Sequence, residues 1–234
     1  MLKIVICLAL TVIISYLLGS CNSAIIVVKH LKHEDIREHG SKNAGLTNTL
    51  RCYGKIPALF TLIGDLAKGI IAVILSLIVF KLIIGSDCFI DPPEWYPMVL
   101  DDKSIGYISG FFAILGHIFP IFYGFKGGKG ILVSSSILIV IDPLTFVIII
   151  PFFAIMVLLT KYVSVSSISA AVVYPFLTFV LHYFVEKLPL NVCIVHVILV
   201  ACTSVLLIYM HRANIKRLME GTENKFTFGK KEAK

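Results

Sequence analysis

The stretch IPALFTLIGDLAKGIIAVILSLIVFKLII, residues 56–84, is the clearest indication of the fold class. About twenty apolar residues in a helix cross the roughly 30 Å hydrocarbon core of a bilayer, and this stretch is longer than that. Asp65 and Lys68 interrupt it three residues apart, and therefore on one face of a helix. Charged groups inside a membrane are costly and pair with each other or line a polar cavity. We therefore expect a transmembrane helix whose charged face meets other helices.

Apolar segments of similar character recur along the whole chain. Hydrophobic residues make up 58% of the 234 residues and charged residues only 15%, against about 25% charged residues in a soluble domain. Window hydropathy gives seven segments, at residues 4–28, 56–84, 105–123, 130–141, 144–160, 166–184 and 192–210. These predict an all-α fold, a polytopic membrane helix bundle with about seven membrane segments.

The fourth segment, residues 130–141, is short for a full crossing. It either spans the bilayer together with segment 144–160 or forms a re-entrant pair with it around Asp142 and Pro143. Both interpretations return the chain to the same side of the membrane.

Basic residues gather in alternate loops. They follow the first segment, occupy residues 124–130, follow the fifth segment and fill the C-terminus, whereas the loop after the second segment holds Asp87, Asp91, Glu94, Asp101 and Asp102. Because cytoplasmic loops are rich in lysine and arginine, we predict an external N-terminus and a cytoplasmic C-terminus. Residues 1–218 then form one integral-membrane domain and residues 219–234 a basic cytoplasmic tail. The net charge of +7 indicates contact with anionic lipids and not with nucleic acid.

The N-terminus permits a second interpretation. Residues 18–21, Leu-Gly-Ser-Cys, resemble the end of a lipoprotein signal peptide. Apolar residues continue past Cys21 as far as Val28, however, and this favours a membrane span from about Ile4 to Val28. Gly19 and Ser20 are then small residues at a close contact between helices.

The loop at residues 124–130 reads GFKGGKG. Glycines allow successive backbone N–H groups to converge on an anion, and lysine adds a mobile positive charge. The loop is not a P-loop, because Lys129 is followed by Gly130 and not by serine or threonine. It predicts either a phosphate site at the membrane surface or a cationic loop that only sets topology.

Three further polar clusters fall on the same predicted face. Residues 40–51 hold hydroxyl and amide side chains together with Arg51, whose guanidinium suits bidentate phosphate binding. Residues 161–167 hold three serines and a tyrosine, and His211 and Asn214 share a helix face after the last segment. Each cluster also has a simpler interpretation. Residues 40–51 would be a polar turn, residues 161–167 a helix start capped by serine, and the residues from His211 onward the basic end of a membrane helix. No metal site is expected, because the spacing of His30, His33 and His39 suits no common ligand set and the cysteines show no CxxC pattern.

Together these clusters resemble the motifs of the PlsY family, integral-membrane glycerol-3-phosphate acyltransferases that use acyl phosphate. The motifs are Gly40-Ser41-Lys42-Asn43-x-Gly45-x-Thr47-Asn48 with Arg51, Gly116-His117-x-Phe119-Pro120 leading into Phe125–Gly130, Tyr162-Val163-Ser164 with Ser166-Ser167, and His211-x-x-Asn214-Ile215-x-Arg217-Leu218-x-x-Gly221-x-Glu223. Asp65-x-x-Lys68-Gly69 also matches. The resemblance spans nearly the whole chain.

The resemblance implies acyl transfer from acyl phosphate to the sn-1 hydroxyl of glycerol 3-phosphate, giving lysophosphatidic acid and phosphate. It implies a multi-pass enzyme of the bacterial cell membrane, a monomer among membrane lipids, with its site on the cytoplasmic face and no cofactor. By carry-over the catalytic residues are Ser41, Arg51, Lys129, His211 and Asn214. The substrate- and phosphate-binding residues are Asn43, Thr47, Asn48, Gly127, Gly128, Gly130, Ser164 and Ser166.

Two other interpretations of the sequence fit less well. A transporter of a phosphorylated solute would suit a bundle with charges in a span, but it needs polar groups on both faces, and here they gather on one. His30 and Asp35 match the H-x4-D signature of a large glycerolipid acyltransferase family. We assign that match to chance, because the soluble αβ body that carries the signature is absent.

Overall fold

The computed structural model describes residues 2–85 and 100–226, and within these ranges the chain is helical and has no strands. Its α-helices are α1 (Leu2–Ser20), α2 (Ser23–Lys32), α3 (Leu46–Tyr53), α4 (Lys55–Ile84), α6 (Asp102–Ile118), α7 (Ile131–Ile141), α8 (Pro143–Thr160), α9 (Val163–Val180), α10 (Leu190–Met210) and α11 (Arg212–Met219). Short 3-10 turns at Ile36–Glu38 and Ile121–Tyr123 and a π-helix, η3 (Leu181–Val185), complete the fold. The acidic residues Asp87, Asp91 and Glu94 and the end of the predicted tail lie outside the described residues.

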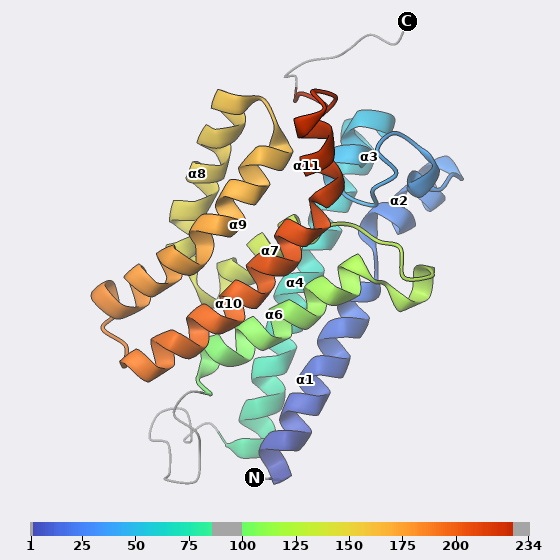
Figure 1. Ribbon diagram of the computed structural model, residues 1–234. Coiled ribbons are helices and arrows are strands. Elements are labelled where there is room, and N and C mark those ends of the chain that lie inside the picture. Colours follow the sequence, from blue (N-terminus) through green and yellow to red (C-terminus); the bar gives the residue numbers. More distant parts are fainter. Residues whose placement is uncertain (1, 86–99, 227–234) are drawn as a thin grey trace, which may run out of the picture.

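The predicted membrane bundle is confirmed. Within the described residues, six helical stretches are long and apolar enough to cross a bilayer, and α7 is a shorter apolar helix. In Figure 1, α1, α6 and α10 run toward the end of the molecule that carries α3 and α11, whereas α4 and α9 run away from it. The 11 residues of α7 extend only about 16 Å, and α8 leads back to the α3–α11 end (Figure 1). The chain therefore returns to the side from which α7 starts, as both interpretations required.

The first apolar segment is two helices and not the single helix that hydropathy predicts. α1 ends at Ser20, and α2 begins at Ser23. Between them the side-chain oxygen of Asn22 accepts a hydrogen bond from the backbone N–H of Ile25 at 3.1 Å, which is the geometry of an N-cap. The chain can therefore change direction here with its first helical amides satisfied.

Glycines allow α1 and α6 to cross closely. A Cβ atom at Gly19 would collide with the backbone carbonyl of Ala113, and one at Gly116 would collide with that of Tyr16. Ser20 turns its hydroxyl back onto the Tyr16 carbonyl at 2.8 Å and exposes little surface. The expected close helix contact at Gly19 and Ser20 is confirmed, and small residues on both helices explain it.

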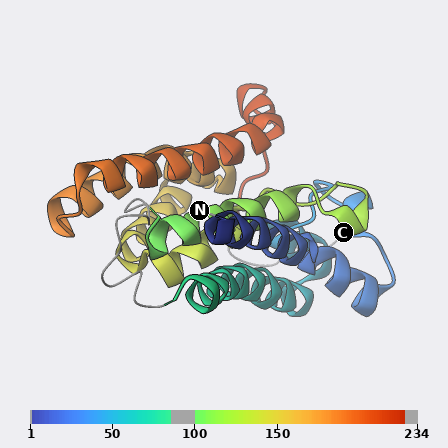
Figure 2. The same cartoon turned by 90° about the horizontal axis from the view of Figure 1, so that it is seen from below.

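The helices pack around α6. Figure 2 shows α10 on one side of α6 and α4 on the other. α1 packs against α4 and α6, and α7 packs against α4, α6 and α8. α8 lies at the periphery against α7 and α9, and only 17% of its apolar window is buried, against 61% for α6. α8 therefore presents most of its surface to lipid.

Candidate active site

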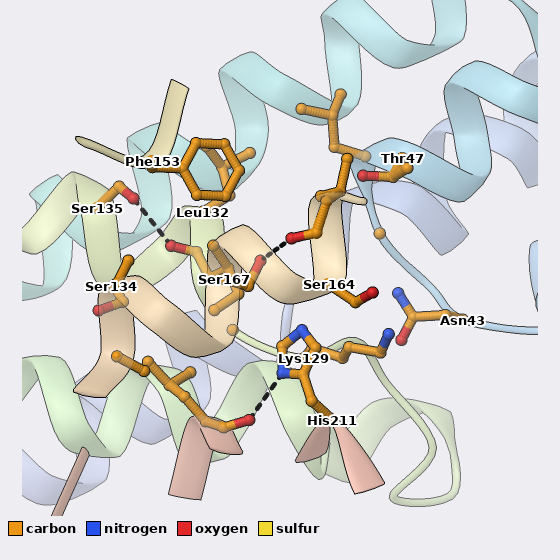
Figure 3. A pocket seen from close by; sticks show the side chains of 18 of the residues that line it. Asn43, Thr47, Lys129, Leu132, Ser134, Ser135, Phe153, Ser164, Ser167 and His211 are labelled. Carbon is orange, nitrogen blue, oxygen red and sulfur yellow. Dashed lines mark hydrogen bonds between the residues drawn. The ribbon is translucent and has the colours of Figure 1, made fainter. Parts of the chain in front are cut away.

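A cavity of about 450 Å³ opens among the helices toward the α3–α11 end. The lining of the cavity has a polar part and an apolar part. The polar part is lined by Ser41, Asn43, Thr47, Asn48, Arg51, Lys129, Gly130, Ser164, Ser167, His211, Asn214, Arg217 and Glu223, and the apolar part by residues of α7, α8 and α9 that include Leu132, Leu138, Phe146, Ile149, Phe153 and Tyr174. Figure 3 shows Lys129 between Ser164, His211 and Asn43, with Phe153 and Leu132 beyond them. A ligand that fills this cavity has a polar head and an apolar tail.

Asn48 holds the first polar loop in shape. Its side-chain oxygen accepts the backbone N–H of Ser41 at 2.9 Å, and its amide donates to the carbonyl of His39 at 3.0 Å. Gly40 has φ +57°, and a Cβ there would collide with the Asn48 side chain and the Cys52 sulfur. This local network places Ser41 and Arg51 on the cavity wall.

The glycine loop is arranged differently from the predicted anion cradle. The N–H of Gly127 donates to the carbonyl of Ile118 at 3.0 Å, and that of Gly128 donates to the carbonyl of His117 at 3.1 Å. A Cβ on Gly128 would collide with the His117 ring. The two glycines therefore pack the loop against the end of α6, and the structure does not bring them to the cavity lining.

The start of α7 at Gly130 supplies the N–H donors that the amides of Gly127 and Gly128 do not. It has φ +86° and begins α7, a conformation that suits glycine. The first N–H groups of a helix have no partner within it and attract anions. Gly130, Ile131 and Leu132 line the cavity, so the amino end of α7 offers donors to a phosphate there.

Lys129 is the central cation of the site. Its amine donates to the side-chain oxygen of Asn214. Burial lowers the pKa of Lys129 to about 8, with Glu223 acting in the opposite direction and Arg217 and Arg51 adding to the decrease. A lysine whose charge is this poorly compensated gains from a phosphate beside it.

Glu223 connects α9 and α11 through three hydrogen bonds. It accepts hydrogen bonds from Asn214 at 2.7 Å, from Ser164 at 3.0 Å and from Arg217 at 2.7 Å. Burial opposes its ionisation, but these bonds and the Arg217 charge outweigh burial and hold the pKa of Glu223 below its ordinary value. Sequence reasoning placed Glu223 in the tail and did not count it as a site residue. Its only signal was its place in the last motif.

His211 is held as a neutral ring. Its Nδ1–H donates to the carbonyl of Leu207 at 2.8 Å, so Nε2 carries the lone pair. Burial lowers the pKa of His211 to about 4, with Lys129 nearby adding to that decrease. The side chain lines the cavity and can accept a hydrogen bond from a hydroxyl group without being charged.

The serines after α8 divide into two roles. Ser164 lines the cavity, as does Ser167, which sequence reasoning did not select. Ser166 is fully buried, its hydroxyl donates to the Tyr162 carbonyl at 3.1 Å, and it does not line the cavity. One helical turn separates Ser164 from Ser167, so the two share a face of α9 that Ser166 does not.

The predicted ion pair lies under the polar part of the cavity. Lys68 Nζ is 2.9 Å from Asp65 Oδ1 and 2.7 Å from His117 Nδ1. Asp65 and His117 line the cavity, and all three side chains are almost fully buried. Because Asp65 is neutralised by Lys68 and Glu223 by Arg217, Lys129 and Arg51 remain as the excess positive charge on the lining, which favours an anion.

Fold and cavity together define a class: an integral-membrane protein that binds an amphipathic, anionic ligand at one end of its helix bundle. The chain belongs to the glycerol-3-phosphate acyltransferase family, whose profile matches residues 9–221. It is an acyltransferase by that membership.

Individual relatives agree over nearly the full length. The chain is 36% identical to a glycerol-3-phosphate acyltransferase of Chlorobaculum parvum, covering 93% of this chain and 96% of the relative, and 37% identical to one of Bacillus subtilis, covering 93% and 97%. The crystal structure of PlsY, an integral membrane glycerol 3-phosphate acyltransferase, in its glycerol 3-phosphate form has a TM-score of 0.72 at 31% identity, covering 94% of this chain and 96% of that one. A lysophosphatidic acid form of PlsY has a TM-score of 0.70 at 29% identity, covering 94% and 95%.

Proposed function

We propose that this chain transfers a fatty acyl group from acyl phosphate to the sn-1 hydroxyl of glycerol 3-phosphate. The observation that carries the proposal is the amphipathic cavity, whose cationic part lies beside an apolar groove between α7, α8 and α9. The groove suits an acyl chain, and the cationic part suits the phosphates of donor and acceptor. Family membership favours this reaction over transport of a phosphorylated solute.

In the reaction the hydroxyl oxygen attacks the acyl carbonyl carbon. The new C–O ester bond forms, the bond between the carbonyl carbon and the phosphate oxygen breaks, and the hydroxyl proton passes to the phosphate that leaves. Acyl phosphate is an activated mixed anhydride, so the protein's main contribution is to position two anions and stabilise developing charge. No separate protein base is needed for that proton.

The residues divide by what they offer. Lys129 and Arg51 supply positive charge to the phosphates, and the amino end of α7 at Gly130 supplies N–H donors. Asn214 orients Lys129 through their hydrogen bond, and Nε2 of His211 is available to the attacking hydroxyl. Ser41, Asn43, Thr47 and Ser164 offer hydroxyl and amide groups for the remaining substrate oxygens. For Asn48, Ser166, Gly127 and Gly128 we propose support of the loops that carry these groups.

We further propose that the cavity faces the cytoplasm of a bacterial cell and that the chain works as a monomer. Support comes from charge: the loop after α2, the glycine loop and α11 carry basic residues and lie at the α3–α11 end of the bundle. Basic loops are retained on the cytoplasmic side. Acyl chains would then enter from the surrounding lipid and glycerol 3-phosphate from the cytoplasm.

The test uses the purified chain in detergent with palmitoyl phosphate and glycerol 3-phosphate, following phosphate release and lysophosphatidic acid formation. Parallel reactions receive palmitoyl-CoA or palmitoyl-acyl carrier protein as donor. We expect turnover with acyl phosphate and none with the thioesters. Equal rates with acyl phosphate and acyl-CoA would overturn the donor assignment.

A further inference from the structure

A second buried cluster lies away from the cavity, near the end of the bundle where α6 and α10 begin (Figure 1). We call it the histidine–carboxylate cluster, and its members are Asp101, Lys103, Asp142, His182, Glu186 and His196. Asp142, His182 and His196 have no exposed side-chain surface, and Asp101, Lys103 and Glu186 form its partly exposed rim. The acyl-transfer proposal does not use these residues.

We propose that this cluster binds a divalent transition-metal ion of the Zn²⁺ class through Asp142, His182 and Glu186. One ligand atom from each of these side chains lies within 4.8 Å of the other two. Asp142 Oδ2 and His182 Nε2 are 3.2 Å apart, close to the roughly 3.4 Å edge of a tetrahedron built with Zn–N and Zn–O bonds of about 2.0–2.1 Å. His182 lies in η3, and Glu186 follows directly after the end of η3. π-Helical turns are frequent at functional sites.

A cation already occupies the centre of this ligand set. Lys103 Nζ is 2.6 Å from both Glu186 oxygens, 3.1 Å from His182 Nε2 and 3.8 Å from Asp142 Oδ1. The ammonium group thus stands where a metal ion would stand. It is carried by a flexible side chain that is 20% exposed, so it can leave toward solvent and exchange with a divalent ion.

His182 can take the tautomer that a metal needs. Its Nε2 lies 3.1 Å from Lys103 Nζ and 3.2 Å from Asp142 Oδ2. With the ring proton on Nδ1, Nε2 accepts from the Lys103 ammonium group, which only donates, and Nδ1–H donates to His196 Nδ1 at 2.9 Å. His196 Nε2–H then donates to Asp101 at 2.9 Å. A chain of this kind behind a ligating histidine is the outer shell found at metal sites.

Asp142 is oriented in the same manner. Tyr107 donates to Asp142 Oδ2 at 2.9 Å, and Thr145 donates to the same oxygen. With the ring proton of His182 on Nδ1, that oxygen and His182 Nε2 are two acceptors 3.2 Å apart, and a shared cation stabilises such a pair. The cluster holds three carboxylates and one ammonium group, so exchange of Lys103 for a divalent ion also reduces its excess negative charge.

The test is a calorimetric titration of the purified full chain with Zn²⁺, with Mg²⁺ as the comparison. We expect one saturable Zn²⁺ per chain, no matching Mg²⁺ binding because of the imidazole ligand, and a thermal midpoint that rises with Zn²⁺ concentration. Absence of saturable Zn²⁺ binding to the wild-type chain overturns the proposal.

Variants locate the ion. His196→Ala should weaken Zn²⁺ binding roughly 10- to 100-fold, the usual cost of an outer-shell partner, and His182→Ala should remove it. Glu186→Gln changes a ligand at the partly exposed rim and replaces His182→Ala as the test if that variant fails to fold. Lys103→Met should tighten binding, because the competing cation is gone.

The matched control is His39→Ala, which removes a partly exposed histidine paired with Glu34 at 3.1 Å. It should leave binding unchanged. Loss of Zn²⁺ in this control, retention of full affinity in Glu186→Gln, or weaker binding in Lys103→Met would each contradict the proposed site.

Discussion

Lys129 lies two residues before α7, and its side chain lines the polar part of the cavity, where it contacts Asn214. We expect Lys129→Ala to lower kcat/KM for glycerol 3-phosphate roughly tenfold or more, which corresponds to about 1.4 kcal/mol of transition-state stabilisation. Lys126→Ala is the matched control, because Lys126 belongs to the same loop but is exposed and does not line the cavity. Steady-state kinetics compare the two variants. Equal losses of kcat/KM would mean that the overall charge of the loop, and not Lys129 in particular, supports the reaction.

The same residue predicts a pH dependence. The pKa of Lys129 is lowered to about 8 by burial, whereas the substrate phosphate, with a second pKa of about 6, is already dianionic there. As pH rises through 8 the free enzyme therefore loses a positive charge that attracts the substrate, and kcat/KM should fall. Arginine stays charged throughout this pH range, so Lys129→Arg should shift the alkaline decrease to higher pH. An unchanged profile in that variant would assign the decrease to another group.

The candidate site was predictable from sequence where short motifs carry it and not where contacts span the chain. Ser41, Arg51, Lys129, His211 and Asn214 all line one cavity, and motif order indicated this. The orientation of the Gly127 and Gly128 amides depends on the end of α6, which no local pattern specifies. Gly128→Ala should accordingly disturb the fold of the loop, not only phosphate binding. Asp142 and His182 are 40 positions apart, so spacing could not reveal their cluster.

At the scale of elements, Glu223 holds the start of α9 and α11 to the chain beyond them. Glu223→Ala would leave Arg217, Asn214 and Ser164 without their acceptor. Since hydrogen bonds to a charged group contribute about 1.5–3 kcal/mol, we expect a lower unfolding midpoint and a lower kcat/KM together.

The control for this change is Glu220→Ala. Glu220 is half-exposed and meets Lys216 at 3.8 Å, and an exposed pair of this kind contributes at most about 0.5 kcal/mol. Denaturation followed by circular dichroism, with kinetics on the same samples, compares the two variants. If they behave alike, Glu223 does not connect these elements.

The helices themselves were largely predictable, because length and apolarity decide whether a segment enters a membrane. The segments 130–141 and 144–160 agree closely with α7 and α8. The break at Asn22 was missed, because a hydropathy window averages over a single capping residue. The contact of Glu223 with Ser164, 59 positions away, likewise lies beyond any local window, and it places part of the predicted tail at the site.

At the level of the whole molecule, the prediction to be tested is the orientation of the bundle in the membrane. We expect the α3–α11 end to face the cytoplasm. In a chain whose six cysteines are replaced by alanine, Lys187→Cys, exposed between η3 and α10, should react with an impermeant maleimide in intact cells. Lys216→Cys, exposed on α11, should react only after permeabilisation. The reverse labelling pattern would place the cavity outside the cell.

The peripheral position of α8 links catalysis to the physical state of the bilayer. Phe146, Ile149 and Phe153 of α8 line the groove. Among the described residues α8 packs mainly on α7 and α9, and most of its apolar window is not buried inside the protein. The thickness and lateral pressure of the surrounding leaflet therefore act directly on the width of the groove. We expect acyl-chain selectivity to change when the same protein is moved between nanodiscs of short- and long-chain lipids, so that chain preference is a joint property of enzyme and membrane.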